Sequence, residues 1–136
     1  VNRANSDYLC YAWTSIQGYS KFGSYIANAN ADGPFVYTGF KPAWVLRKAT
    51  TRAEPWMLMD NKRSPINPLA TILDPSSNAG DSTVAGDYAM DLLSNGFKIR
   101  SGNTSYGNHT GGVIYIYMAF AENPFVTSTG IPATAN

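Results

Sequence analysis

Short apolar stretches in which hydrophobic and polar residues alternate recur along this chain, and polar segments separate them. Alternation with a period of two is typical of β-strands that bury one face. The most apolar stretch, residues 113–120, follows glycine-rich sequence and is the best candidate for a central strand. Pro42 has no backbone N–H, so we expect it at the start or edge of a strand. The pattern predicts strands over residues 7–13, 35–40, 43–48, 56–60, 97–100 and 113–120.

Long polar segments join these predicted strands. Residues 61–70, 74–87 and 101–112 are rich in the residues that form turns and loops. The one window with a helical pattern, residues 88–93, is shorter than a mean helix of about 11 residues. The sequence therefore predicts an all-β fold, an antiparallel β-sandwich that is jelly-roll-like and has long polar loops. We expect residues 1–126 to form this single domain and residues 127–136 to form an extended polar tail.

The composition narrows the class of function. The chain has 136 residues, enough for one domain with a buried core, and 14% of them are charged. An ordinary soluble domain has about 25% charged residues. A net charge of +1 gives no basis for nucleic-acid binding, and no stretch approaches the about 18 apolar residues of a membrane span. One cysteine and one histidine argue against a disulfide framework and a His-rich or Cys-based metal centre, so we expect no cofactor and no metal.

A similarity between two segments of the chain leaves two interpretations of the first residues open. Residues 8–13 resemble residues 115–120, and both follow a loop of asparagine, serine and glycine type. In one interpretation the domains are in tandem, and residues 1–15 are the closing strand of an upstream module. In the other, two buried aromatic strands of one sandwich look alike. The chain begins at Val1 rather than Met, and we expect it to be part of a longer protein or a processed product.

Four motifs, taken in order, resemble a recurrent domain of unknown function from large virion proteins of tailed bacteriophages. In those chains the domain occurs in tail-fibre or tail-spike-like proteins, beside concanavalin-like lectin modules. The resemblance implies a virion protein that is assembled in the bacterial cytoplasm and carried on the extracellular particle. It implies other virion subunits as partners, a homo-oligomer with a trimer favoured, and no catalytic residues. The likeness covers most of residues 8–126, and its motifs lie at residues 18–25, 32–43, 91–100 and 115–125.

Aromatic and amide side chains in the polar loops are the candidate ligand-binding residues. Tyrosine stacks on the faces of sugars, and asparagine forms hydrogen bonds with their hydroxyls. Any polar surface loop contains such residues, so the alternative that they bind nothing stays open. The candidates are Tyr88, Asn103, Tyr106 and Asn108.

Other residues that could carry chemistry have simpler interpretations. His109 lies in a small-residue loop without a second metal ligand at suitable spacing, so we expect an exposed loop histidine. Cys10 alternates with Tyr8 and Ala12, which predicts a buried free thiol in a strand.

Charged residues form two groups in the sequence. The aspartates could in principle supply an acid and a base, but in turn-rich sequence we expect them to cap and turn the backbone. Their spacing with Asn78 is not that of an EF-hand. We expect the basic residues to form a solvated loop face rather than a site for an acidic ligand. The two groups are Asp74, Asp81, Asp87 and Asp91, and Arg47, Lys48, Arg52, Lys62 and Arg63.

Together these features predict a virion structural protein that is not an enzyme. The first hypothesis is a tail-fibre or spike domain that contributes to attachment to host-surface polysaccharide. The alternative is a capsid decoration or head-fibre protein with a purely structural role. A glycan depolymerase ranks third, because the sequence offers no defensible acid–base pair.

Overall fold

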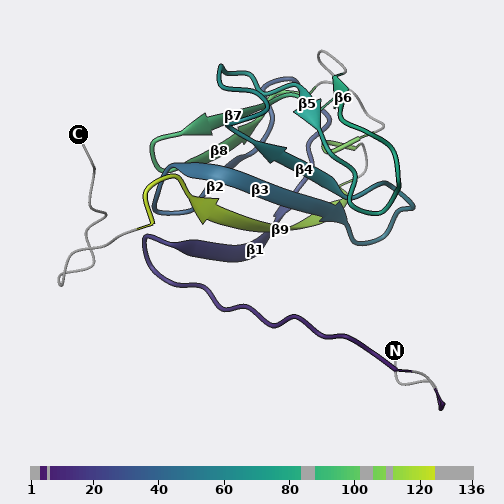
Figure 1. Ribbon diagram of the computed structural model, residues 1–136. Coiled ribbons are helices and arrows are strands. Elements are labelled where there is room, and N and C mark those ends of the chain that lie inside the picture. The colour runs from purple at the N-terminus through teal and green to yellow at the C-terminus, as the bar shows by residue number, and fades with distance from the viewer. Residues whose placement is uncertain (1–3, 6, 84–87, 102–105, 110–111, 125–136) are drawn as a thin grey trace.

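The strands of the computed structural model follow the alternating pattern of the sequence (Figure 1). The structure describes residues 4–5, 7–83, 88–101, 106–109 and 112–124. These residues contain no helix, and hence none long and apolar enough to span a membrane. The strands are β1 (Ser20–Ile26), β2 (Phe35–Tyr37), β3 (Pro42–Ala49), β4 (Met57–Asp60), β5 (Thr71–Ile72), β6 (Ser82–Thr83), β7 (Met90–Leu93), β8 (Gly96–Ile99) and β9 (Ile114–Ala121).

Two antiparallel sheets make up the body of the protein. Sheet A has the strand order β1-β9-β3-β4, and sheet B has the order β2-β8-β7. The short strands β5 and β6 form a separate pair. Because β9 lies between β1 and β3, the prediction that residues 113–120 form a central strand is confirmed. Pro42 is the first residue of β3 and adjoins an irregularity in its pairing, as expected of a residue without a backbone N–H.

Aromatic side chains from both sheets meet in the core, among aliphatic side chains and methionines. Phe97 of sheet B packs edge-to-face against Tyr25 and Tyr117 of sheet A, with ring centroids 6.2 and 5.2 Å apart. Tyr25 also stacks on Tyr115 at 5.2 Å. Because both sheets contribute to one buried cluster, the predicted antiparallel β-sandwich is confirmed.

The structure contradicts the first predicted strand, over residues 7–13. No residue from 7 to 15 belongs to a strand, and the segment extends away from the sandwich (Figure 1). Cys10 is exposed, so the predicted buried thiol is wrong. Alternation predicts which face a strand would bury, but it does not predict whether a neighbouring strand is available for pairing. Among the described residues, no strand pairs with residues 7–15.

The sequence pattern also missed β1, which pairs with β9 over its whole length. Its polar residues Lys21 and Ser24 and the intervening Gly23 interrupt the alternation. Residues 88–93, the weak helical window, contain the strand β7 instead. The predicted tail, residues 127–136, lies outside the described residues.

Candidate ligand-binding pocket

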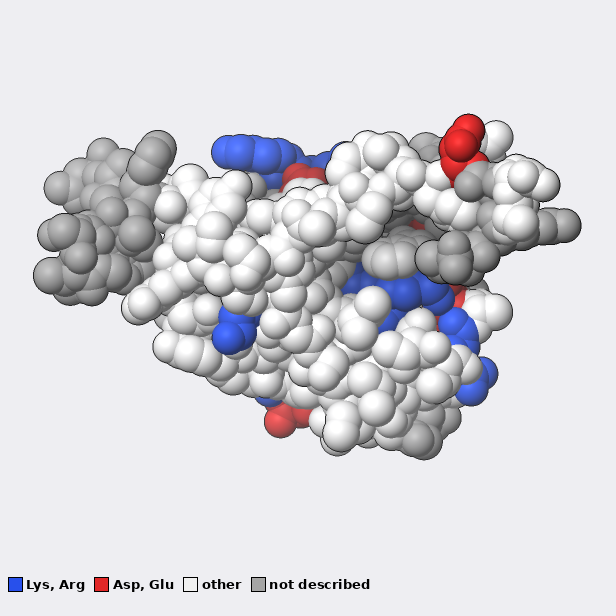
Figure 2. Space-filling view, turned by 90° about the horizontal axis from the view of Figure 1, so that it is seen from below, with Lys and Arg blue, Asp and Glu red and all other residues white. Residues whose placement is uncertain are grey.

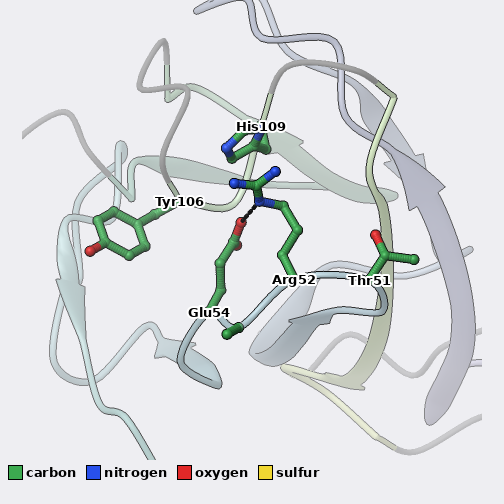
Figure 3. A pocket seen from close by; sticks show the side chains of 6 residues that line it. Thr51, Arg52, Glu54, Tyr106 and His109 are labelled. Atoms are coloured by element: carbon green, nitrogen blue, oxygen red, sulfur yellow. Dashed lines mark ion pairs between the residues drawn. The ribbon is translucent and has the colours of Figure 1, made fainter.

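A pocket of about 480 Å³ opens where the segment after β3 meets the loop before β9. We call it the Glu54 pocket. Figure 3 shows Arg52 reaching between Glu54 and His109, with Tyr106 on the side opposite Thr51. The lining residues are Thr51, Arg52, Ala53, Glu54, Tyr106 and His109.

The carboxylate of Glu54 is the most distinctive group in this pocket. Its side chain is only 5% exposed. One oxygen, Oε2, accepts a hydrogen bond of 2.7 Å from the Tyr115 hydroxyl. The other, Oε1, is buried and has no hydrogen-bond partner among the described residues. Its ion pair with Nε of Arg52 is 3.8 Å long, too long for a hydrogen bond, so the pocket contains an unsatisfied acceptor.

The hydroxyl of Tyr115 holds that carboxylate in place. Burial and the hydrogen bond to Glu54 raise the pKa of the Tyr115 hydroxyl, and a hydrogen bond with the backbone of His109 opposes this. The hydroxyl therefore stays protonated at neutral pH and remains a donor to Glu54. Since Tyr115 lies on the central strand β9, the Glu54 carboxylate is anchored to the core of sheet A.

A buried arginine lies under the same loop. Nη2 of Arg47, on β3, donates a hydrogen bond of 2.8 Å to the backbone oxygen of Tyr88. Its Nε and Nη1 are buried and have no hydrogen-bond partner among the described residues. Gly107 lies against the guanidinium at φ +73°, where an added Cβ would be 2.8 Å from Nη2. The backbone oxygen of Gly107 accepts a 2.9 Å hydrogen bond from the Tyr25 hydroxyl, which fixes the loop over the arginine.

Asn108 fastens this loop to a segment far away in the sequence. Oδ1 accepts hydrogen bonds from the backbone N–H groups of Asn28 and Ala29, at 2.8 and 3.3 Å. Nδ2 donates to Oδ1 of Asn28 and to the backbone oxygens of Asn30 and Ser101, at 3.1, 2.7 and 3.0 Å. The side chain is fully buried, so Asn108 positions its neighbours Tyr106 and His109 and cannot itself contact a ligand.

The structure places the four predicted ligand-binding residues differently. Tyr106 lines the pocket, and the centre of its ring lies 5.2 Å from that of the partly buried Tyr88. Asn108 is buried, and Asn103 lies outside the described residues. His109, expected to be an exposed loop residue, is half-buried in the pocket wall.

Sequence reasoning did not select Glu54 and considered Arg52 only as one of a basic group. An acidic residue that follows a basic run is a weak signal, and nothing local indicates that Glu54 is buried. The expected solvated basic face is wrong for Arg47, which is buried. Lys48 donates to the backbone oxygen of Arg52, and Arg63 pairs with Asp60 and Asp81 at 2.6 and 3.1 Å.

The aspartates that the sequence analysis considered as an acid and a base do not form a catalytic pair among the described residues. Asp74 accepts hydrogen bonds from Ser76 in a turn, which lower the pKa of its carboxyl, as expected for a residue that turns the backbone. Asp91 pairs with Arg100 at 3.3 Å, and Asp87 lies outside the described residues. No group of three or more His, Cys, Asp or Glu in the described part of the chain is arranged to hold a metal ion.

Comparison with known proteins identifies the chain at the level of a domain family. No curated protein and no solved structure matches it significantly. A family model described as a domain of unknown function (DUF7483) matches residues 1–124, and the chain therefore belongs to this family.

Proposed function

We propose that this chain is a non-catalytic attachment domain of a virion protein, a tail fibre or tail spike, that binds host-surface saccharides at the Glu54 pocket. The observation that carries the binding proposal is Oε1 of Glu54, a buried acceptor on a residue of the pocket wall that has no donor among the described residues. A saccharide hydroxyl both donates and accepts hydrogen bonds. It would accept from the half-exposed guanidinium of Arg52, and a shift of that side chain would let it donate to Oε1 of Glu54.

The aromatic ring of Tyr106 suits the same class of ligand. The C–H groups on one face of a sugar ring pack on an aromatic side chain, while polar groups at the edge of the site fix its orientation. The contact with the Tyr88 ring restricts the Tyr106 ring, so Tyr106 would meet a ligand with little loss of side-chain freedom. A single pocket of this kind binds weakly, and several copies on one particle would raise the avidity by about 10²–10⁴.

Binding is favoured over hydrolysis by the number of carboxylates. Glycosidases generally place two Asp or Glu side chains on either side of the scissile bond. Among the described residues the pocket wall supplies one, Glu54, and one of its oxygens already accepts from Tyr115.

The virion assignment is supported by the motifs that resemble phage tail-protein domains, at residues 18–25, 32–43, 91–100 and 115–125. Gold-labelled antibody against the domain, imaged on intact phage particles, tests it. Label on the tail tip or fibres agrees with the proposal. Label spread over the head would instead support the capsid decoration protein.

Saccharide binding is tested by measuring the affinity of the chain for an array of bacterial surface polysaccharides. Glu54→Gln keeps an acceptor for Tyr115 but removes the charge in the pocket, and Arg52→Gln removes the neighbouring cation. We expect each to weaken binding at least about tenfold, since a hydrogen bond to a charged group contributes about 1.5–3 kcal/mol. Lys62→Gln, which removes an exposed cation from the turn after β4, is the matched control and should bind like the wild type. Unchanged affinity in both pocket variants would contradict the proposal, provided that their melting temperatures match that of the wild type.

A further inference from the structure

The face of sheet A that points away from the core is apolar across all four strands. We call it the outer face. One row crosses the whole sheet in register: Phe22 of β1 lies opposite Met118 of β9, which lies opposite Leu46 of β3, which lies opposite Leu58 of β4. A soluble protein rarely leaves such a continuous apolar surface uncovered unless it is a binding surface.

A shallow hollow lies in the middle of the outer face. Its volume is about 300 Å³, and it is bounded by Phe22, Leu46, Trp56, Ile116 and Met118. Ile116, which lines it, is 44% exposed although it belongs to the central strand. The hollow is therefore apolar and accessible, which suits an aromatic or aliphatic side chain.

The segment before β1 exposes the complementary kind of surface. We call residues 7–15 the arm. Leu9, Tyr11 and Trp13 are 79%, 67% and 56% exposed, and the rings of Tyr11 and Trp13 stack on each other at 5.7 Å. The arm lies outside the sandwich and belongs to no strand (Figure 1). A sequence that alternates like a strand and exposes its aromatics is suited to pairing with another surface.

The arm and the outer face fit each other in length and charge. The six arm residues 8–13, when extended, span about 20 Å, and an eight-residue strand such as β9 spans about 26 Å. Within residues 7–15 the one charged residue is Asp7, and the nearest charge beside the hollow in β3 is Lys48, of opposite sign. Figure 2, which shows the side seen from below Figure 1, has a mostly white surface with separate blue and red patches, one of the blue ones in a hollow.

The area available is also of the right size. Tyr11 and Trp13 share one face of an extended arm and would bury about 300–500 Å² at about 150–250 Å² each, and Leu9 on the same face adds to this area. A stable protein–protein interface buries about 800 Å² on each partner. A reciprocal exchange, in which each chain both gives an arm and receives one, therefore reaches the usual size.

The arm of the same chain is directed elsewhere. Ile16 and Ser20 form a bridge that closes a tight turn, and Oγ of Ser15 accepts a 3.1 Å hydrogen bond from the backbone N–H of Phe22. These contacts hold the base of the arm at the open edge of β1, and the arm then departs from the sandwich (Figure 1). We propose that the outer face of sheet A binds the arm of a second copy of this chain, with an aromatic ring of that arm in the hollow.

Cys10, the one cysteine of the chain, is exposed in the arm and makes the proposal directly testable. One tagged copy keeps Cys10, and a second copy with a different tag carries Cys10→Ser and Ser24→Cys, which puts a thiol on the outer face of β1. After mixing and treatment with a short bismaleimide, we expect a covalent product that contains both tags. The matched control replaces Ser24→Cys by Ser94→Cys, in the exposed turn between β7 and β8 of sheet B, and should give at least tenfold less of this product.

A chain with both Cys10 and Ser24→Cys distinguishes the remaining occupants. Linkage between chains supports the proposal. Linkage only within one chain means that the arm folds back onto its own sheet, and no linkage means that something else covers the outer face. Either of these last two results overturns the proposal.

Sedimentation velocity gives an independent measurement. We expect the wild-type chain to self-associate and Tyr11→Ser with Trp13→Ser to weaken that association at least tenfold. The arm lies outside the core, so the doubly substituted chain should melt at the wild-type temperature when both are measured at a concentration where they are monomeric. Tyr37→Ser, which removes an exposed tyrosine from β2, should associate like the wild type. A wild-type chain that stays monomeric at about 100 µM would have a dissociation constant weaker than about 10⁻⁴ M. This result would overturn the inference, whatever the Glu54 pocket binds.

Discussion

The pKa values of the core tyrosines are raised by burial. The pKa of Tyr25 is raised to about 12, because burial outweighs the opposing effect of the nearby Arg47 cation. Burial also raises the pKa of Tyr115 and of Tyr117. In the folded protein these hydroxyls remain protonated at a pH where they would ionise in an unfolded chain.

We therefore expect the free energy of unfolding to fall above pH 10. Between pH 10 and 12 the unfolded chain releases tyrosine protons that the folded chain retains, so each rise in pH favours the unfolded state. The slope is up to about 1.4 kcal/mol per pH unit for each such tyrosine. Urea unfolding at pH 8, 9, 10 and 11 measures it, and Tyr25→Phe should reduce the slope. A free energy that stays constant up to pH 11 would contradict this prediction.

At the scale of the elements, sheet B depends on a close approach between β2 and β8. Gly96 is the first residue of β8 and pairs with Tyr37 of β2 and Leu93 of β7. An added Cβ at Gly96 would lie 2.1 Å from the backbone oxygen of Val36. Any side chain at this position must push β2 away from β8, which disrupts the pairing of sheet B.

Gly96→Ala should accordingly lower the free energy of unfolding by about 1–3 kcal/mol, the usual cost of overpacking. Gly80→Ala is the matched control, because an added Cβ there meets nothing within 4 Å. We expect the control to change stability by less than about 0.5 kcal/mol. Urea denaturation of both variants makes the comparison, and equal midpoints would show that the strands can separate without cost.

At the scale of the whole molecule, the two sheets share one core. Phe97 of sheet B packs against both Tyr25 and Tyr117 of sheet A. A pair of backbone hydrogen bonds between Leu69 and Met90 links the segment between β4 and β5 to sheet B. Neither sheet can bury its apolar face without the other. The arm is separate from this core, and its contacts do not contribute to it.

We expect the sandwich to unfold in one cooperative transition. In a Trp13→Phe variant the fluorescence comes from Trp44 and Trp56, which report on sheet A, while amide exchange in β7 and β8 reports on sheet B. The two probes should give the same midpoint in urea at one fixed protein concentration, because two-state unfolding requires coincident transitions. Separate midpoints would mean that one sheet folds without the other.

Much of the fold could be predicted from the sequence because the signal for a strand is local. The strands β3, β4, β8 and β9 each fall on an alternating stretch, and each was expected. Residues 7–13 alternate equally well and form no strand, while β1 alternates poorly and pairs with β9 over seven residues. Strand pairing depends on which distant segment lies alongside in the fold, and a local sequence pattern carries no information about that segment.

The sequence by itself determined the all-β class, the central position of β9 and the presence of Tyr106 in a polar loop. Only the tertiary structure decided which polar side chains are buried. Asn108 meets Asn28 across 80 residues, and Tyr115 meets Glu54 across 61. Burial of a polar group is stable only when hydrogen-bond partners are supplied, often by distant segments, so neither the anchoring role of Asn108 nor the unpaired acceptor of Glu54 can be predicted from their neighbours in the chain.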